Sequence, residues 1–315
     1  MAVGTIHGTI PDYYQKRLKR LPEYRDKEIV IYGMAGGGLR QPQQLMLLNY
    51  YYSLGAEFDL IINIDGFNDV AIPITEYINF KLHPSFPRSW GSRVANTVSP
   101  ELISLYADKK VLQSSHISSA RFMSNPWSRN SPLSNLIWTI KHNRYGNKLS
   151  RLDQQIATHS DRKDGQRSYE KTGPDYTFTD WDSLYEYIVE MWATSSQLIN
   201  AAAQAKGARY FHFLQPNQYV EGSKPIMSDE ERAVAFVEQG YGTVYRVAHP
   251  FIQKKTAWFA ENGIAYHDLT YLYKEVENPV YIDNCCHFNH LGSAMIVNKV
   301  VDTIHQANLA EASAK

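Results

Sequence analysis

Short apolar runs alternate with helical segments along this chain, and that alternation restricts its fold more than any other feature. Apolar runs rich in β-branched or aromatic residues occur at 28–32, 58–64, 208–214 and 264–268. Helical segments are predicted over about 42–54, 181–202, 229–262 and 290–305. The run at 58–64 is apolar enough for a strand that is covered on both faces. The order therefore predicts a doubly wound α/β domain with a mostly parallel sheet.

The alternation stops between about 79 and 179. At 315 residues the chain can bury a full core, and we interpret residues 1–315 as a single domain with a polar insertion or lid over that stretch. Within it, residues 141–175 are crowded with charged and small polar side chains. We expect an exposed excursion there, and a mobile loop is the simplest form of it.

The overall charge is balanced, with 32 lysines and arginines against 32 aspartates and glutamates. We therefore expect no basic field that would attract nucleic acid or anionic lipid. The two cysteines, Cys285 and Cys286, are adjacent and cannot join distant segments. No stretch reaches the roughly 18 apolar residues of a spanning helix, and the first ten residues lack signal-peptide features, so the sequence as it stands predicts a soluble chain. Compartment and oligomeric state are not specified.

The segment Gly66-Phe67-Asn68-Asp69 directly follows the second predicted strand. Ligands bind at the carboxyl ends of strands in open α/β sheets, so this segment is a candidate site. The side-chain amide of Asn68 could donate a hydrogen bond to the oxyanion of an ester-hydrolysis intermediate. The alternative is a turn in which Asn68 or Asp69 caps the next helix.

A glycine cluster, Gly33 to Gly38, follows the first predicted strand. A backbone N–H can approach an oxyanion closely where no side chain intervenes, and Gly38 is the candidate for this donor. The alternative is a glycine-rich turn that lets a helix pack closely on the sheet.

The carboxyl-terminal segment 281–292 combines an acid with a histidine near the start of a helix. His287 could serve as a general base that a carboxylate, Asp283, orients. Asp283 could instead be an acid attracted to a helix amino terminus. A zinc site from Asp283, the two cysteines, His287 and His290 is the third interpretation, but such close neighbours cannot readily converge on one tetrahedral ion.

Together these three segments resemble the conserved blocks of the SGNH hydrolases, the GDSL-like esterases and lipases. Gly66-Phe67-Asn68-Asp69 is similar to the family's Gly-x-x-Asn block, in which both residues help to form the oxyanion hole. Gly38 matches the glycine after the family's second strand, and the run from His287 to Gly292 matches its histidine block. The resemblance covers about 28–69 and 281–301, and it implies a flavodoxin-like, three-layer fold.

The chain departs from the family pattern in two places. The family's acid stands three residues before the histidine, where this chain has Asn284, and Asp283 lies one residue earlier. Either a bulge brings Asp283 into position, or Asn284 orients the imidazole without a charge. In addition, no Gly-x-Ser nucleophile block precedes Glu28, and the first serine, Ser53, falls in a predicted helix.

The resemblance implies a serine ester hydrolase that acts on small-molecule or saccharide acyl esters without a metal or organic cofactor. We expect the chain as given to be an inactive, amino-terminally truncated form that lacks the first strand and its serine. The reading frame is then expected to continue upstream into a Gly-x-Ser strand, preceded by a membrane anchor or signal segment. The alternatives are a catalytically dead binding protein and a Rossmann-type nucleotide-binding domain, although Ala35 stands where that motif needs glycine.

Overall fold

The computed structural model describes residues 9–78, 82–88, 90, 100–123, 125–162, 173–174 and 177–314. The chain divides into two compact units. Unit 1 comprises Met1–Glu76 and Thr177–Lys315, and unit 2 comprises Tyr77–Tyr176. Unit 2 is thus an insertion in the sequence of unit 1, and its ends lie close to residues 79 and 179.

Unit 1 contains a parallel sheet of three strands, β1 (Leu60–Asp65), β2 (Arg209–Leu214) and β3 (Ala265–Asp268). They lie in the order β1-β2-β3, and Ile64 pairs with Phe213 in register. The prediction of an α/β fold with a parallel sheet is confirmed by these strands. All three end at the same edge of the sheet, because parallel strands share one direction.

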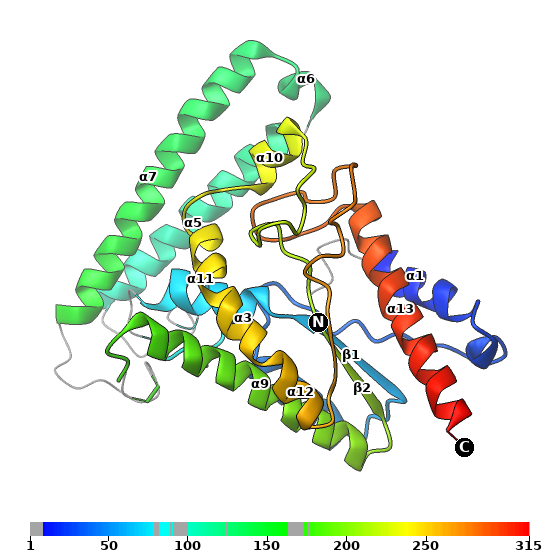
Figure 1. Ribbon diagram of the computed structural model, residues 1–315. Helices are drawn as coiled ribbons and strands as arrows, with labels where there is room; N and C mark the ends of the chain where they lie inside the picture. Colours follow the sequence, from blue (N-terminus) through cyan, green and yellow to red (C-terminus); the bar gives the residue numbers. More distant parts are fainter. Residues whose placement is uncertain are drawn as a thin grey trace. The chain divides into compact units, whose positions relative to one another are not determined.

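Helices cover both faces of this sheet (Figure 1). The helical elements of unit 1 are α1 (Thr9–Leu18), η1 (Pro22–Tyr24), α2 (Gln43–Ser53), α3 (Phe67–Ile72), α9 (Trp181–Ala205), α10 (Asp229–Ala235), α11 (Tyr241–Lys254), α12 (Thr256–Glu261) and α13 (His290–Ser313), and η2 (Pro73–Tyr77) leads into unit 2. The single helical region expected at 229–262 is therefore three helices. The cap of α9 is Asp180, whose side chain accepts from Ser183 N at 2.8 Å.

Alternate residues of β2 face the two helical layers. Phe211 and Phe213 belong to an apolar core with α1 and α13, where Ile296 and Val300 are fully buried. His212 faces the other way and packs on α9, with its ring centroid 5.0 Å from that of Trp192. This period of two is what a strand buried on both faces requires.

The strand predicted at Glu28–Tyr32 is not formed within the described residues. Ile29 and Ile31 pack partly against the core, whereas Val30 and Tyr32 are exposed. The segment is therefore extended and one face is covered, as in a strand, but it pairs with none of β1 to β3. Apolar alternation predicts burial of a face correctly, but a strand also needs a hydrogen-bonded neighbour.

Unit 2 is a helical hairpin of α5 (Pro100–Met123), α6 (Pro126–Arg129) and α7 (Pro132–Arg162). Lys109 pairs with Asp153, and the His116 and His142 rings are hydrogen-bonded at 2.9 Å, so α5 and α7 are antiparallel. The expectation of a mobile loop is wrong for residues 141–162, which form the second half of α7. Its polar composition reflects an exposed helix that buries one narrow face. No described helix is long and apolar enough to cross a membrane.

Candidate active site

Asp283 and His287 form a hydrogen-bonded pair in the loop before α13. His287 Nδ1 lies 2.6 Å from Asp283 Oδ2, and both side chains are more than a third exposed. Burial alone would raise the pKa of Asp283, but the hydrogen bond from His287 lowers it below the ordinary value. Within the described residues, His287 Nε2 has no hydrogen-bond partner. The pair therefore presents an accessible imidazole nitrogen that a carboxylate orients, as a general base requires.

A backbone bulge explains how Asp283 reaches His287 across one extra residue. Cys286 has a φ of +60°, a left-handed conformation that residues with a Cβ seldom adopt. Asp283 Oδ1 accepts from Cys285 N at 2.8 Å, which tightens the turn. The side-chain oxygen of Asn284 accepts from Cys285 Sγ at 3.6 Å, and its backbone carbonyl accepts from Tyr219 OH at 2.9 Å. The sequence offered Asp283 or Asn284 as the residue that orients His287. In the structure, Asp283 contacts the imidazole.

A buried ion pair holds the segment that leads into this loop. Glu231 Oε1 accepts from Val280 N at 2.7 Å and Tyr281 N at 2.9 Å, and its other oxygen lies 3.5 Å from Lys224 Nζ. Lys224 also donates to the carbonyl of Val276 at 2.7 Å. Both charged side chains are fully buried. This framework fixes residues 276–281 and so sets the position of Asp283.

Gly66 has a conformational role that only glycine can fill. Its φ is +110°, and a Cβ at this position would lie 2.2 Å from Leu214 Cδ1. Its N–H already donates to Asp69 Oδ2 at 3.0 Å. The predicted contribution of Gly66 to an oxyanion hole therefore cannot be a donated hydrogen bond, because the donor is in use. Gly66 shapes the turn that presents Asn68.

Asn68 and Gly38 have donors available. Asn68 lies in the first turn of α3, is half-buried, and donates one amide hydrogen to Leu39 O over a long 3.4 Å. Gly38 has a φ of +74° and lies in a turn closed by Leu39 N and Gly36 O. Its own N–H donates no hydrogen bond within the described residues. The contact with Leu39 brings these two predicted residues together.

Asp69 joins the two segments that carry these donors. Its Oδ1 accepts from Gln41 N at 2.7 Å, and its Oδ2 accepts from Gly66 N. Burial and the neighbouring Asp65 carboxylate raise the pKa of Asp69 to about 7, although both backbone N–H groups and Arg40 act to lower it. Asp69 is therefore a positioning residue for Gly38 and Asn68. The sequence alone left it as a helix cap.

Tyr245 packs beside the Gly66 segment. Its ring lies 5.6 Å from that of Phe67, and burial raises its pKa, with further contributions from Cys286, Asp268 and Asp69. Gln218, which follows β2, donates to Asp283 O at 3.1 Å. The Gly66 segment and the histidine loop thus lie near the same edge of the sheet. No hydrogen bond joins Asn68 to His287 within the described residues.

A second Ser-His-Asp arrangement lies in the core. Ser196 Oγ is 2.8 Å from His212 Nδ1, and His212 Nε2 is 2.7 Å from Asp65 Oδ1. Ser196 and His212 have no exposed surface, and Asp65 also accepts from Trp192 Nε1 at 2.7 Å. Burial would raise the pKa of Asp65, but His212 lowers it to about 2. No substrate can reach these atoms, so the network stabilises the end of β1.

This network was not found from the sequence. The available signal was a single histidine, His212, inside the apolar run at 208–214. A buried histidine needs a hydrogen-bond partner. The same network argues against the nucleotide-binding alternative, because the Asp65 carboxylate is enclosed by Trp192 and His212 and cannot bind a ribose.

No described serine is hydrogen-bonded to His287. Ser53 lies at the end of α2 and donates to Asn49 O. Burial raises the pKa of the Cys286 thiol well above its ordinary value, so Cys286 is a poor nucleophile. Among the described residues, no group of three or more His, Cys, Asp or Glu side chains could hold a metal ion.

Comparison with protein-family models, curated proteins and solved structures finds no match to this chain. The family assignment stays a prediction from the sequence blocks.

Replacing Asp69 with asparagine is expected to flatten the dependence of stability on pH. The folded chain holds the Asp69 proton more tightly than the unfolded chain, whose aspartates have a pKa of about 4. The free energy of unfolding therefore falls as the pH rises from about 4 to about 7. Asp69→Asn removes this fall, on the order of a few kcal/mol. Urea unfolding at pH 4.5 and pH 7.5 tests this, and an equal fall in both proteins would contradict it.

Proposed function

We propose that this chain carries the base and the oxyanion donors of an SGNH-type serine ester hydrolase that acts on small-molecule or saccharide acyl esters. The observation that carries the proposal is the contact between Asp283 and His287, made across an extra residue by the left-handed backbone of Cys286. A structural loop gains nothing from holding an exposed imidazole in this way. The strained residue supports a functional role for the pair.

The proposed reaction assigns each group one task. A serine hydroxyl attacks the ester carbonyl carbon while His287 Nε2 takes its proton, and Asp283 stabilises the resulting imidazolium through Nδ1. The Gly38 N–H and the free amide hydrogen of Asn68 donate to the oxyanion. The intermediate then expels the alcohol, which takes the proton from His287. Water hydrolyses the acyl-enzyme by the same steps, and the serine is restored.

The nucleophile is the part of this mechanism that the chain does not supply in a recognisable motif. We therefore expect little turnover of a short-chain nitrophenyl ester by the 315-residue chain, with a background rate that His287→Ala does not change. Ser196→Ala is the matched control for the buried arrangement, and it is expected to leave that rate unchanged as well. Turnover that is lost in His287→Ala would show that another serine serves and that the block assignment is wrong.

The absence of a Gly-x-Ser block also favours a second candidate, a serine-less protein that binds esters without hydrolysing them. Such a protein would bind a slowly hydrolysed acyl ester at Asn68 and His287. Isothermal titration with His287→Ala and Asn68→Ala variants distinguishes it, because a binding protein would show saturable binding that both variants weaken.

A further inference from the structure

The tip of the hairpin in unit 2 exposes a group of large apolar side chains. We call this group the tip cluster: Phe122, Trp127, Leu133, Leu136, Ile137 and Ile140. It comes from the end of α5, from α6 and from the first turns of α7, which lie together at one end of the hairpin (Figure 1). Trp127 is the most exposed, at 90 %. Large exposed apolar side chains that gather at one end of a hairpin indicate an interaction site.

The turn that presents Trp127 is hydrogen-bonded internally. The buried Ser128 donates to Phe122 O at 2.6 Å, and Asn125 Oδ1 accepts from Trp127 N at 3.1 Å. Trp127 is therefore held outward by a defined turn. An exposed indole on a fixed turn loses little conformational entropy when it binds.

Helix α7 has two apolar faces, and α5 covers one of them. On the covered face, Trp138 and Tyr145 stack on the His116 ring, with centroids 5.8 and 5.2 Å away. On the other face, Leu133, Ile137 and Ile140 are spaced by four and three residues and are exposed. Packing of the hairpin thus leaves this second face without a partner.

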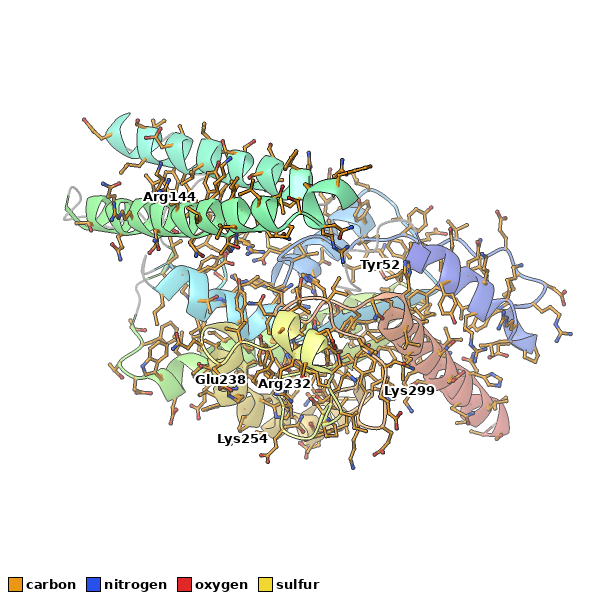
Figure 2. All side chains as sticks on the ribbon, turned by 90° about the horizontal axis from the view of Figure 1, so that it is seen from above. Tyr52, Arg144, Arg232, Glu238, Lys254 and Lys299 are labelled. Atoms are coloured by element: carbon orange, nitrogen blue, oxygen red, sulfur yellow. The ribbon has the colours of Figure 1, made fainter. Side chains whose placement is uncertain are left out.

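The same face becomes basic further along α7. Arg144, Lys148 and Arg151 continue the spacing, are exposed, and form no ion pair with described residues. Arg144 is labelled on α7 in Figure 2. Between residues 109 and 152 the sequence has eight lysines and arginines and no aspartate or glutamate. The whole chain is neutral, but this part of it carries a net positive charge. The expectation that the chain has no basic field is therefore corrected for this stretch.

We propose that unit 2 binds the surface of an anionic lipid bilayer, with the tip cluster among the headgroups and Arg144, Lys148 and Arg151 beside the lipid phosphates. An apolar stripe that carries an exposed tryptophan and continues into basic residues fits the interface of a membrane. Each lysine or arginine near such a surface adds attraction to anionic lipid. The helices lie against the bilayer and do not span it.

Charge distinguishes the bilayer from the other occupants. A second copy of the hairpin would place two basic faces against each other, and the repulsion would oppose pairing. Nucleic acid would satisfy the basic residues but would leave the aliphatic side chains Leu133, Ile137 and Ile140 unused, since bases stack on aromatic rings. Only an anionic bilayer matches both halves of the face.

Vesicle co-sedimentation of the full chain tests the proposal. We expect binding to vesicles of phosphatidylcholine with phosphatidylserine, weak binding to phosphatidylcholine alone, and loss with added salt. Trp127→Ser with Ile137→Ser is expected to weaken partitioning about tenfold. Replacing Arg144, Lys148 and Arg151 with glutamine is expected to weaken it about a hundredfold. The matched control replaces Lys206, Lys254 and Lys274 of unit 1 with glutamine and should bind as the parent chain does.

Circular dichroism of each variant checks that the helices remain. Quenching by brominated lipids that is reduced in Trp127→Tyr would support insertion of the tip. Equal binding by the tip variant would show adsorption by charge alone and would overturn the proposal. The proposal would also be overturned if the chain did not bind vesicles but formed a dimer that the tip substitutions abolish. It would be overturned as well if the control triple variant weakened vesicle binding as much as the Arg144, Lys148 and Arg151 variant does. Competition by single-stranded RNA that survives the tip substitutions would assign the basic face to nucleic acid instead.

Discussion

A version of the chain extended at its amino terminus by a strand that ends in Gly-x-Ser is expected to hydrolyse short-chain nitrophenyl esters at least about a thousandfold faster than the 315-residue chain. The reason is that the proposed base and the two proposed oxyanion donors have no group to activate without a nucleophile. Glu28–Tyr32 is extended and half-covered but pairs with no described strand, so an added strand has a backbone segment with which to pair. The extension should therefore also raise the thermal midpoint.

The controls separate catalysis from folding. Changing the added serine to alanine should abolish turnover and keep the gain in thermal midpoint. Asp283→Asn should lower turnover by orders of magnitude, because the imidazole loses its orienting charge while the loop keeps its shape. An extended chain that is more stable but inactive would refute the assignment of His287 as the base.

Breaking the buried pair of Glu231 and Lys224 is expected to have the largest effect on stability. Glu231→Gln leaves the Lys224 ammonium buried without its counter-charge, which costs about 3–5 kcal/mol. It also weakens the hydrogen bonds that Val280 N and Tyr281 N donate, so the histidine loop should lose its fixed position. Urea unfolding measures the first effect, and faster amide exchange at residues 280–283 measures the second.

The exposed pair of Arg246 and Glu238 provides the matched control. Its Glu238 side chain is 79 % exposed, so Glu238→Gln should change stability by less than about 1 kcal/mol. Similar losses in Glu231→Gln and Glu238→Gln would contradict the role given to the buried pair. Replacing Glu231 and Lys224 together with Met should restore part of the stability but not the order of the loop.

The sequence predicted the elements whose signal is local. The strand at 208–214 and the helix that begins at His290 were found because their apolar spacing reflects burial by neighbours. Glu28–Tyr32 has the same spacing, but whether it becomes a strand depends on a hydrogen-bonded partner far away in the chain. The polar part of α7 was missed for a related reason, since a long exposed hairpin helix needs few apolar residues.

In the candidate site, too, residues with a local sequence signal could be predicted, and contacts between distant residues could not. Asn68 and His287 could be proposed from short blocks, and Asp283 could be offered as the acid. The left-handed backbone at Cys286, which brings Asp283 into contact, has no signature in its residue type. Asp69 was visible only as a cap because its second contact, with Gln41 N, joins residues 28 positions apart. Long-range hydrogen bonds of this kind decide the geometry of the site, and a single sequence does not display them.

The most direct test of the central claim is covalent labelling of the extended chain by a nitrophenyl organophosphate, with the modified residue located by mass spectrometry. The account predicts one adduct, on the serine of the added Gly-x-Ser strand. Labelling should slow at least about a hundredfold in His287→Ala, and Asn68→Ala should reduce ester turnover about 100- to 1,000-fold. Labelling of another serine, or a rate that His287→Ala does not change, would contradict the claim that Asn68 and His287 form one ester-hydrolysis site.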